Sequence, residues 1–246
     1  MLALAATIQE GDYTGFSFFI GSMAMLAATV FFFAERGNVA GKWRLSMTVS
    51  ALITGIAAVH YYYMRDVWAA TGTSPTSLRY IDWTLTVPLM CVEFYLILRA
   101  LQPVAIGILY RLLLGSIAML VLGYLGEAGL MNATLAFVLS CVGWLVVLYE
   151  VFLGKASQVN ASSASDSLKG AFSALRNFAL FGWAIYPIGY WVGYMGGEQV
   201  SSGASWLNVA YNLADVINKV GFGLIIYLLA RRESATTQVA GAASPA

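Results

Sequence analysis

Apolar stretches of about 20 residues recur seven times along the chain and are separated by short polar connections. They run approximately over residues 13–35, 43–64, 76–100, 104–125, 131–153, 170–194 and 205–230. About 20 residues is the length that an α-helix needs to cross the hydrocarbon core of a bilayer. The pattern therefore predicts an all-α integral membrane protein, a seven-transmembrane-helix bundle in a lipid bilayer.

Composition agrees with this class. The chain is 60% hydrophobic and only 10% charged, whereas an ordinary soluble domain is about 25% charged. The net charge of +1 and the lack of a basic stripe give no reason to expect a nucleic-acid partner. Cys91 and Cys141 lie inside apolar stretches, where a cysteine is usually a small buried hydrophobe. Neither a disulfide framework nor a metal motif is predicted.

The chain divides into three parts. Residues 1–12 are expected to form an extracellular segment; their Leu- and Ala-rich start could be the remnant of a signal peptide, but it lacks a basic n-region. Residues 13–232 form the helical bundle, whose longest connection, 154–170, is rich in Ser and Ala. The Ala-, Ser- and Thr-rich tail, 233–246, is predicted to be disordered.

The charges of the connections predict the orientation. Basic residues cluster in or beside the first, third and fifth connections and the tail: Arg36, Lys42, Arg44, Arg99, Arg111, Lys155, Lys169, Arg231 and Arg232. The connections on the other side contain only Arg65. By the positive-inside rule the N-terminus is outside and the C-terminus is cytoplasmic.

Few ionisable residues lie deep in the spans: His60, Arg79, Asp82, Glu93, Asp215 and Lys219. Each charge in hydrocarbon costs about 2.5–3.5 kcal/mol even on insertion scales, so these residues are candidates for function. Asp215 and Lys219 are four apart and share a helix face. Burial favours the neutral lysine amine, which condenses with an aldehyde to a Schiff base. The alternative is a structural ion pair that joins two helices.

The third span carries two carboxyl groups on one side. Arg79, Asp82 and Thr86 share a face, and Glu93 follows Asp82 by eleven residues, about 20° past three full turns and about 16 Å along the axis. Asp82 falls in the extracellular half, beside cations that favour its ionised form, and Glu93 falls in apolar surroundings that favour its protonated form. Such a pair could serve as acceptor and donor in a directional proton relay. The alternative is two unrelated polar residues.

An aromatic stripe marks the sixth span, where Trp183, Tyr186, Pro187 and Tyr190 follow helical spacing. Such a stripe is usually part of a core. With Trp83, Met90 and Met119 from other helices it could instead line a slot for a flat conjugated ligand. Pro88 and Pro187 are plausible kink sites.

Taken together, these motifs resemble the microbial rhodopsins, and specifically the proteorhodopsins of bacteria. The resemblance rests on Arg79-Tyr-x-Asp82-Trp83 with Thr86, Pro88 and Glu93, on Trp183-x-x-Tyr186-Pro187, and on Asp215-x-x-x-Lys219. It covers essentially the whole chain from Asp12 to Arg231.

The resemblance implies a light-driven outward proton pump, not an enzyme, in the bacterial plasma membrane. All-trans retinal would be bound to Lys219 as a protonated Schiff base, with Asp82 as proton acceptor, Glu93 as donor and Asp215 as second counterion. Arg79, Thr86 and His60 would act together with Asp82. The retinal slot would be lined by Trp83, Met90, Met119, Trp144, Trp183, Tyr186, Pro187 and Tyr190. Relatives imply a homo-oligomer, a pentamer or a hexamer.

Three positions vary within the family. Phe19 stands where many members carry a tryptophan that contacts the histidine across the subunit boundary, which puts that contact in doubt. Met90 occupies the colour-tuning position, and its apolar side chain predicts green absorption. Phe137 replaces the glycine of antenna-binding relatives and argues against a carotenoid partner.

Other functions remain open at this point. Sodium pumps and chloride pumps differ from the Asp82, Thr86 and Glu93 set, which favours proton transport. A sensory photoreceptor would need a transducer and could dispense with the donor, so Glu93 favours a pump. A seven-helix transporter without retinal would leave the purified protein colourless.

Overall fold

The computed structural model describes residues 10–163, 165–195 and 205–242, and the regular structure within them is helical. The long helices are α1 (Tyr13–Glu35), α2 (Arg44–Thr71), α3 (Thr76–Arg99), α4 (Ile106–Glu127), α5 (Ala133–Phe152) and α9 (Ser205–Ala242). Two 3₁₀ turns, η1 (Arg36–Asn38) and η2 (Gly41–Trp43), join α1 to α2. In the part of the chain that the structure describes, six helices are long and apolar enough to cross a membrane.

The sixth crossing, expected over 170–194, is present but is interrupted. It consists of α7 (Asp166–Asn177), a π turn η3 (Phe178–Gly182), α8 (Ile185–Tyr190) and a π turn η4 (Trp191–Met195). Pro187 has no N–H to donate to the carbonyl of Trp183, so the regular hydrogen-bond ladder cannot continue there. A short helix, α6 (Lys155–Ala161), also lies within the connection before this crossing.

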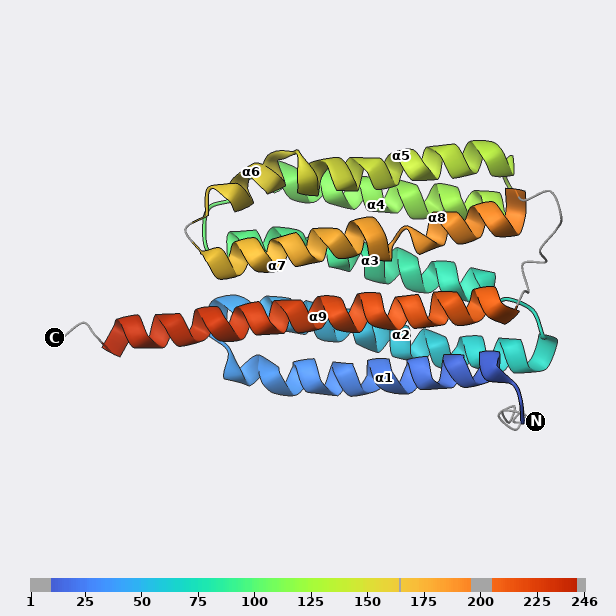
Figure 1. Cartoon of the computed structure of the whole chain (residues 1–246), viewed down its shortest axis with the longest axis horizontal. Coiled ribbons are helices and arrows are strands. Elements are labelled where there is room, and N and C mark those ends of the chain that lie inside the picture. The colour runs from blue at the N-terminus through green and yellow to red at the C-terminus, as the bar shows by residue number, and fades with distance from the viewer. Residues whose placement is uncertain (1–9, 164, 196–204, 243–246) are drawn as a thin grey trace.

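The helices form one bundle in which sequence neighbours lie side by side (Figure 1). Helix α1 packs mainly on α2, α4 mainly on α5, and α9 closes the bundle against α1, α2 and α7. Glycine permits the closest of these contacts, because a Cβ on Gly143 would lie 2.7 Å from the backbone nitrogen of Met119. Helix α1 begins and α9 ends at opposite ends of the bundle (Figure 1). This arrangement is the one that an odd number of crossings requires.

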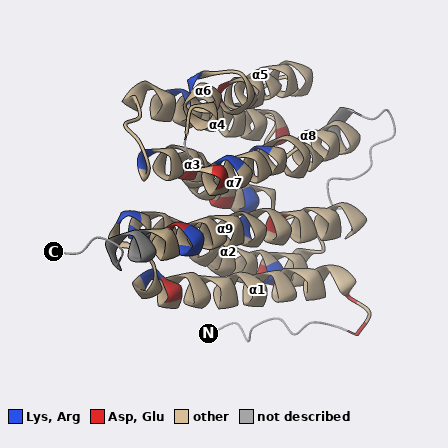
Figure 2. Ribbon diagram, turned by 60° about the vertical axis from the view of Figure 1, so that its left-hand side comes forward, with Lys and Arg blue, Asp and Glu red and all other residues tan. Residues whose placement is uncertain are grey.

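The polarity of the bundle is that of a membrane protein. Large apolar side chains cover its outside; Phe181 is 73% exposed and Leu114 is 69% exposed. Positions of Lys, Arg, Asp and Glu are few along the ribbon (Figure 2). Several of these residues are buried, including Asp82, Glu93 and Lys219. Lipid solvates such an apolar outer surface, whereas water would not.

Helix α9 continues beyond the expected end of the bundle at residue 232 and reaches Ala242. The start of this extension is held by side chains: Ser165 donates to Glu233 over 2.5 Å, and the backbone N–H of Ala40 donates to Ser234 over 2.8 Å. Alanine, which is abundant here, is the best helix former. The structure thus describes residues 233–242, the first part of the tail, as a continuation of α9.

Candidate functional site

Lys219 lies at the centre of the bundle between two carboxylates. Its Nζ is 2.5 Å from Asp82 Oδ2 on α3 and 2.7 Å from Asp215 Oδ2, one turn earlier on α9. All three side chains are almost completely buried. Ions this deep in a protein are retained only when they are paired, since removing one partner leaves an uncompensated charge. The structure thus brings Asp82 of α3 to the Asp215 and Lys219 pair of α9, which lies far from it in sequence.

Arg79 points to a different set of partners than expected. Its Nη2 donates to Asn208 Oδ1 over 2.9 Å and its Nη1 donates to Asn212 Oδ1 over 3.3 Å, both from α9. The ring of Tyr211 lies 5.1 Å from the guanidinium carbon. Within the described residues no ion pair joins Arg79 to Asp82. Two neutral amides hold this buried cation in place.

Thr86 and His60 lie near Asp82 without bonding to its carboxylate. Thr86 Oγ1 donates to the backbone carbonyl of Asp82 over 2.9 Å. His60 is partly buried, and its Nδ1 lies 2.8 Å from the carbonyl of Ile56. The imidazole is close enough to Asp82 for an electrostatic interaction. Asp82 Oδ1 is buried and has no hydrogen-bond partner among the described residues.

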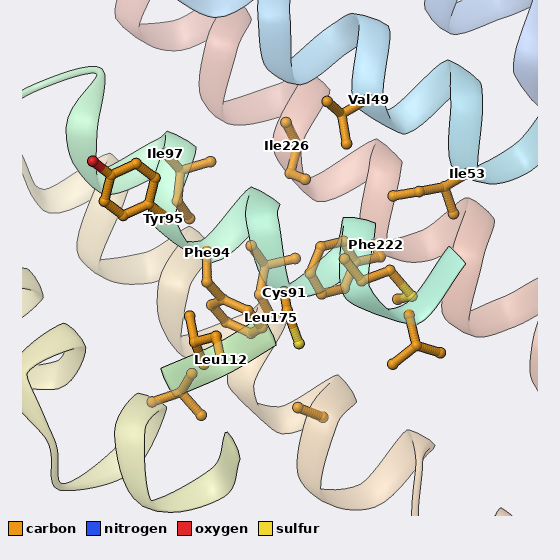
Figure 3. Packing of buried hydrophobic residues seen from close by; sticks show 14 of the residues in the cluster. Val49, Ile53, Cys91, Phe94, Tyr95, Ile97, Leu112, Leu175, Phe222 and Ile226 are labelled. Carbon is orange, nitrogen blue, oxygen red and sulfur yellow. The ribbon is translucent and has the colours of Figure 1, made fainter. Parts of the chain in front are cut away.

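Glu93 occupies a separate, apolar part of the bundle. Its side chain is fully buried, and its Oε1 accepts a hydrogen bond of 3.2 Å from Ser50 on α2. Its Oε2 has no partner in the described part of the chain. Phe94 and Phe222 pack with ring centres 5.6 Å apart in the same region. Figure 3 shows this packing, in which α2 contributes Val49 and Ile53, and α9 contributes Phe222 and Ile226.

An apolar pocket opens between α3, α4, α5 and the sixth crossing, with about 640 Å³ of empty space including its mouth. It is lined by seven of the eight residues expected to surround a conjugated ligand: Trp83, Met119, Trp144, Trp183, Tyr186, Pro187 and Tyr190. Met90, the eighth, is buried in the adjacent core and is not part of the pocket wall. Pockets that hold flat apolar ligands have such mainly apolar and aromatic walls, with a few polar groups among them.

Tyr186 links the pocket to the counterions of the lysine, although Lys219 itself is not one of the lining residues. Tyr186 and Trp83 line the pocket with ring centres 4.7 Å apart, and the Tyr186 hydroxyl donates to Asp215 Oδ1 over 3.1 Å. A buried amine beside an apolar aromatic slot, with a carboxylate oxygen that has no hydrogen-bond partner in the described protein, fits an aldehyde with a long conjugated chain. The residues present therefore fit the retinal that the sequence implies.

Sequence reasoning missed the side-chain amides. Asn208 and Asn212 contact Arg79, and Asn218 contacts Tyr186, but an uncharged amide does not stand out in a membrane span as a charge does. A signal was present, because Asn208 and Asn212 lie on the same face of α9 as Asp215 and Lys219 at helical spacing. Ser50, the partner of Glu93, carried no such signal, since isolated serines are common in membrane helices.

Comparison with known proteins finds relatives along most of the chain. Residues 12–232 match the family model described as bacteriorhodopsin-like protein. The chain is 51% identical over 227 residues to a green-light absorbing proteorhodopsin of Gamma-proteobacterium EBAC31A08, covering 92% of this chain and 90% of the relative. It is also 51% identical over 233 residues to a blue-light absorbing proteorhodopsin of Gamma-proteobacterium Hot 75m4, covering 94% and 92%.

A solved structure matches over nearly the same range. The crystal structure of a blue light-absorbing proteorhodopsin from Med12 shares 43% identity with a TM-score of 0.77, over 90% of this chain and 99% of that chain. Identity to green-absorbing and blue-absorbing relatives is equal, so overall similarity does not decide which colour this chain absorbs.

Proposed function

The chain belongs to the bacteriorhodopsin-like family, and from that premise we propose that it is a light-driven proton pump with named residues in its path. Retinal, which this family binds covalently through a lysine, is its cofactor, and the bilayer is its surroundings. In this chain Lys219 is the attachment site. The aromatic pocket beside it holds the conjugated chain, and Trp83, Trp183 and Tyr186 form its walls.

When bound, retinal absorbs light and makes the proton on the lysine nitrogen transferable. Every further step uses side chains of the protein. Asp82 Oδ2, 2.5 Å from Lys219 Nζ, accepts that proton. Asp215 stays as the second carboxylate, fixed by the hydroxyl of Tyr186. Asp82 thus lies within hydrogen-bond reach of the lysine nitrogen, as a general base must.

The second half of the path begins at Glu93. This carboxyl group is enclosed by apolar side chains, where an isolated carboxylate is costly, so it rests as the acid that can give a proton. Ser50 holds its Oε1 and leaves the other oxygen to carry the proton. Donation from Glu93 to the lysine nitrogen, followed by uptake from the side nearer to Glu93, restores the starting state.

The direction of transport follows from the placement of the two groups. By the loop charges Asp82 faces the extracellular half and Glu93 the cytoplasmic half of α3. A proton that leaves through Asp82 and is replaced through Glu93 moves outward. In a bacterium this places the protein in the plasma membrane, where outward transport stores energy.

We also propose a homo-oligomer of five or six chains without a carotenoid antenna. The antenna proposal is supported by Phe137, which lines the pocket with its ring 5.4 Å from that of Tyr190. A bulky ring in this position leaves less room for a second flat pigment than a glycine would.

The single observation that carries the proposal is the position of Lys219 between Asp82 and Asp215, with Glu93 remote on the same helix as Asp82. The test is expression in cells with added all-trans retinal, followed by a visible spectrum and by external pH under illumination. We expect colour and a light-induced acidification that a protonophore abolishes.

Two variants assign the roles. Lys219→Ala should be colourless, because no amine remains to bind the aldehyde. Asp82→Asn should keep its colour, shifted to longer wavelength, and lose acidification, because the acceptor is gone. Colour with no acidification in the unmodified protein would refute the pump and favour a sensory photoreceptor. Wild-type acidification by Asp82→Asn would refute the assigned acceptor.

A further inference from the structure

The break in the sixth crossing deprives backbone carbonyls of their α-helical partners, among them those of Ala179 and Gly182. Because Pro187 has no N–H, the carbonyl of Trp183 accepts instead from the N–H of Tyr186, over 3.2 Å. The carbonyl of Gly182 thereby loses the amide that an α-helix would give it. Likewise the N–H of Trp183 donates to Phe178, over 3.0 Å, in π fashion, which frees the carbonyl of Ala179.

Side chains from two other helices satisfy these carbonyls. Asn218 Nδ2 on α9 donates to the carbonyl of Gly182 over 3.0 Å, a contact we term the carbonyl cap. Trp144 Nε1 on α5 donates to the carbonyl of Ala179 over 2.9 Å. No water is present in hydrocarbon to replace such a donor, so each bond matters more here than at a wet surface.

The carbonyl cap is built into the counterion region. Asn218 directly precedes Lys219 in sequence, and its Nδ2 also lies 3.4 Å from the hydroxyl of Tyr186. That hydroxyl donates to Asp215. One amide thus contacts both the broken helix and the tyrosine that fixes a counterion. Only glycine at position 182 leaves room for this amide, since a Cβ there would lie 2.0 Å from Asn218 Oδ1.

We propose that Asn218 is a positioning residue of the pump. Its hydrogen bond to Gly182 keeps the sixth crossing in the π-turn conformation, and loss of that bond is coupled to proton movement at Lys219 and Asp215. This rests on the proposed function. Tyr186 and Asn218 share contacts, so a charge change at Asp215 alters the bonds available to the amide. Release of the cap lets the π turn relax toward α-helical bonding. One residue of register amounts to about 100° of rotation and about 1.5 Å of rise between α7 and α8.

The test compares variants that remove the donor with and without a change of volume. Asn218→Leu keeps a similar size and lacks the N–H; Asn218→Ala removes both. Gly182→Ala disrupts the same contact, because the added Cβ displaces the Asn218 amide. Matched controls are Asn177→Ala, at an exposed asparagine of α7, and Gly170→Ala, where a Cβ would meet nothing within 4 Å.

The first measurement is amide hydrogen exchange of retinal-loaded protein in lipid nanodiscs, in the dark, for peptides covering residues 178–190. Loss of one net hydrogen bond should raise the opening equilibrium, and hence the exchange rate, about two- to ten-fold. We expect this in Asn218→Leu, Asn218→Ala and Gly182→Ala and not in the controls. The double variant Asn218→Ala/Gly182→Ala should exceed Asn218→Ala by little, because both changes remove one contact.

The second measurement is the recovery of the dark spectrum after a flash, which should change by a similar factor in the same variants. Unchanged exchange in both Asn218 variants overturns the proposal, as does faster exchange with unaltered recovery. Wild-type behaviour of Asn218→Leu alone would mean that size, not the donor, matters, and also overturns it. Failure of the proposed function is distinct: it appears as an unpigmented or non-pumping wild type, whereas exchange reports on the cap in either case.

Discussion

Replacing Glu93 by glutamine is the sharpest test of the donor side of the path. Glutamine keeps the shape of the side chain and can still accept the hydrogen bond from Ser50, but it has no proton to give. Glu93 is fully buried, and the side chains of Ser46 and Ser50 on α2 interact with it. A serine hydroxyl is far too weak an acid at neutral pH to replace a carboxyl group as proton donor.

The expected magnitude follows from this enclosure. A positioned general acid contributes about 10²- to 10⁴-fold to a proton transfer. We expect the recovery of the dark spectrum after a flash to slow at least about 100-fold in Glu93→Gln at neutral pH. Recovery should also become dependent on bulk protons, slowing about ten-fold for each unit of rising pH, as a step first order in protons requires. The wild-type rate should vary far less over the same range.

The assay is flash photolysis of protein in nanodiscs between pH 6 and 9, with azide added as a small permeant acid. Azide should restore much of the lost rate in Glu93→Gln, since it can carry a proton to the buried lysine. Ser50→Ala is the matched control, because it removes one hydrogen bond and leaves the proton; we expect a two- to ten-fold effect. If Glu93→Gln recovers at the wild-type rate with the wild-type pH profile, Glu93 is not the donor.

Three further outcomes are expected. His60→Asn should displace the midpoint of the acid-induced red shift, because the imidazole interacts with the carboxylate of Asp82; an unchanged titration, measured by visible absorption, would remove His60 from the site. The wild type should absorb in the green, and Met90→Gln should move its maximum to shorter wavelength; a blue maximum in the wild type would contradict the colour prediction. Gly126→Ala should lower stability by about 1–3 kcal/mol in thermal denaturation, since its Cβ would fall 2.0 Å from the Tyr190 hydroxyl; Gly170→Ala is the neutral comparison.

The fold was predictable from sequence because lipid allows so few solutions. Every backbone polar group in hydrocarbon must be bonded within its own segment, so apolar length translates directly into helices. The ends were less predictable. Helix α2 runs to Thr71, although its expected end was residue 64, and it ends at Gly72, whose φ of 64° is the left-handed conformation that glycine readily adopts. Arg65 and Asp66, in this added part of the helix, pair with one another over 2.7 Å. The guanidinium of Arg65 also lies 4.5 Å from the ring of Tyr62.

The site was predictable as far as charge reveals it. The acid–base set stood out because ionised groups are costly in a membrane span. The broken sixth crossing was foreseen only as a kink at Pro187. A π turn depends on side chains elsewhere in the fold that donate hydrogen bonds to its free carbonyls, here Trp144 and Asn218. The local sequence of residues 178–182 does not predict these donors. The asparagines of α9 were not predicted as site residues for the same reason, since their function depends on the residues that they contact in the fold.

Because neutral amides contact Arg79, the buried site around Lys219 can contain four charged side chains and still have a net charge of zero. Arg79 and Lys219 contribute two positive charges, and Asp82 and Asp215 contribute two negative charges, all deeply buried. Had carboxylates held Arg79 in place of Asn208 and Asn212, the sum would be negative. Buried net charge is what a low-dielectric interior penalises most.

The balance also determines which step is easy. Moving a proton from Lys219 to Asp82 leaves the sum at zero, because a cation and an anion disappear together. Such a transfer needs only local rearrangement over 2.5 Å. The later steps, loss of the proton from Asp82 and supply from Glu93, each change the charge of a buried region and must be accompanied by structural change. The physical demand for motion therefore falls after the first transfer, which is where a hinge in the sixth crossing would be used.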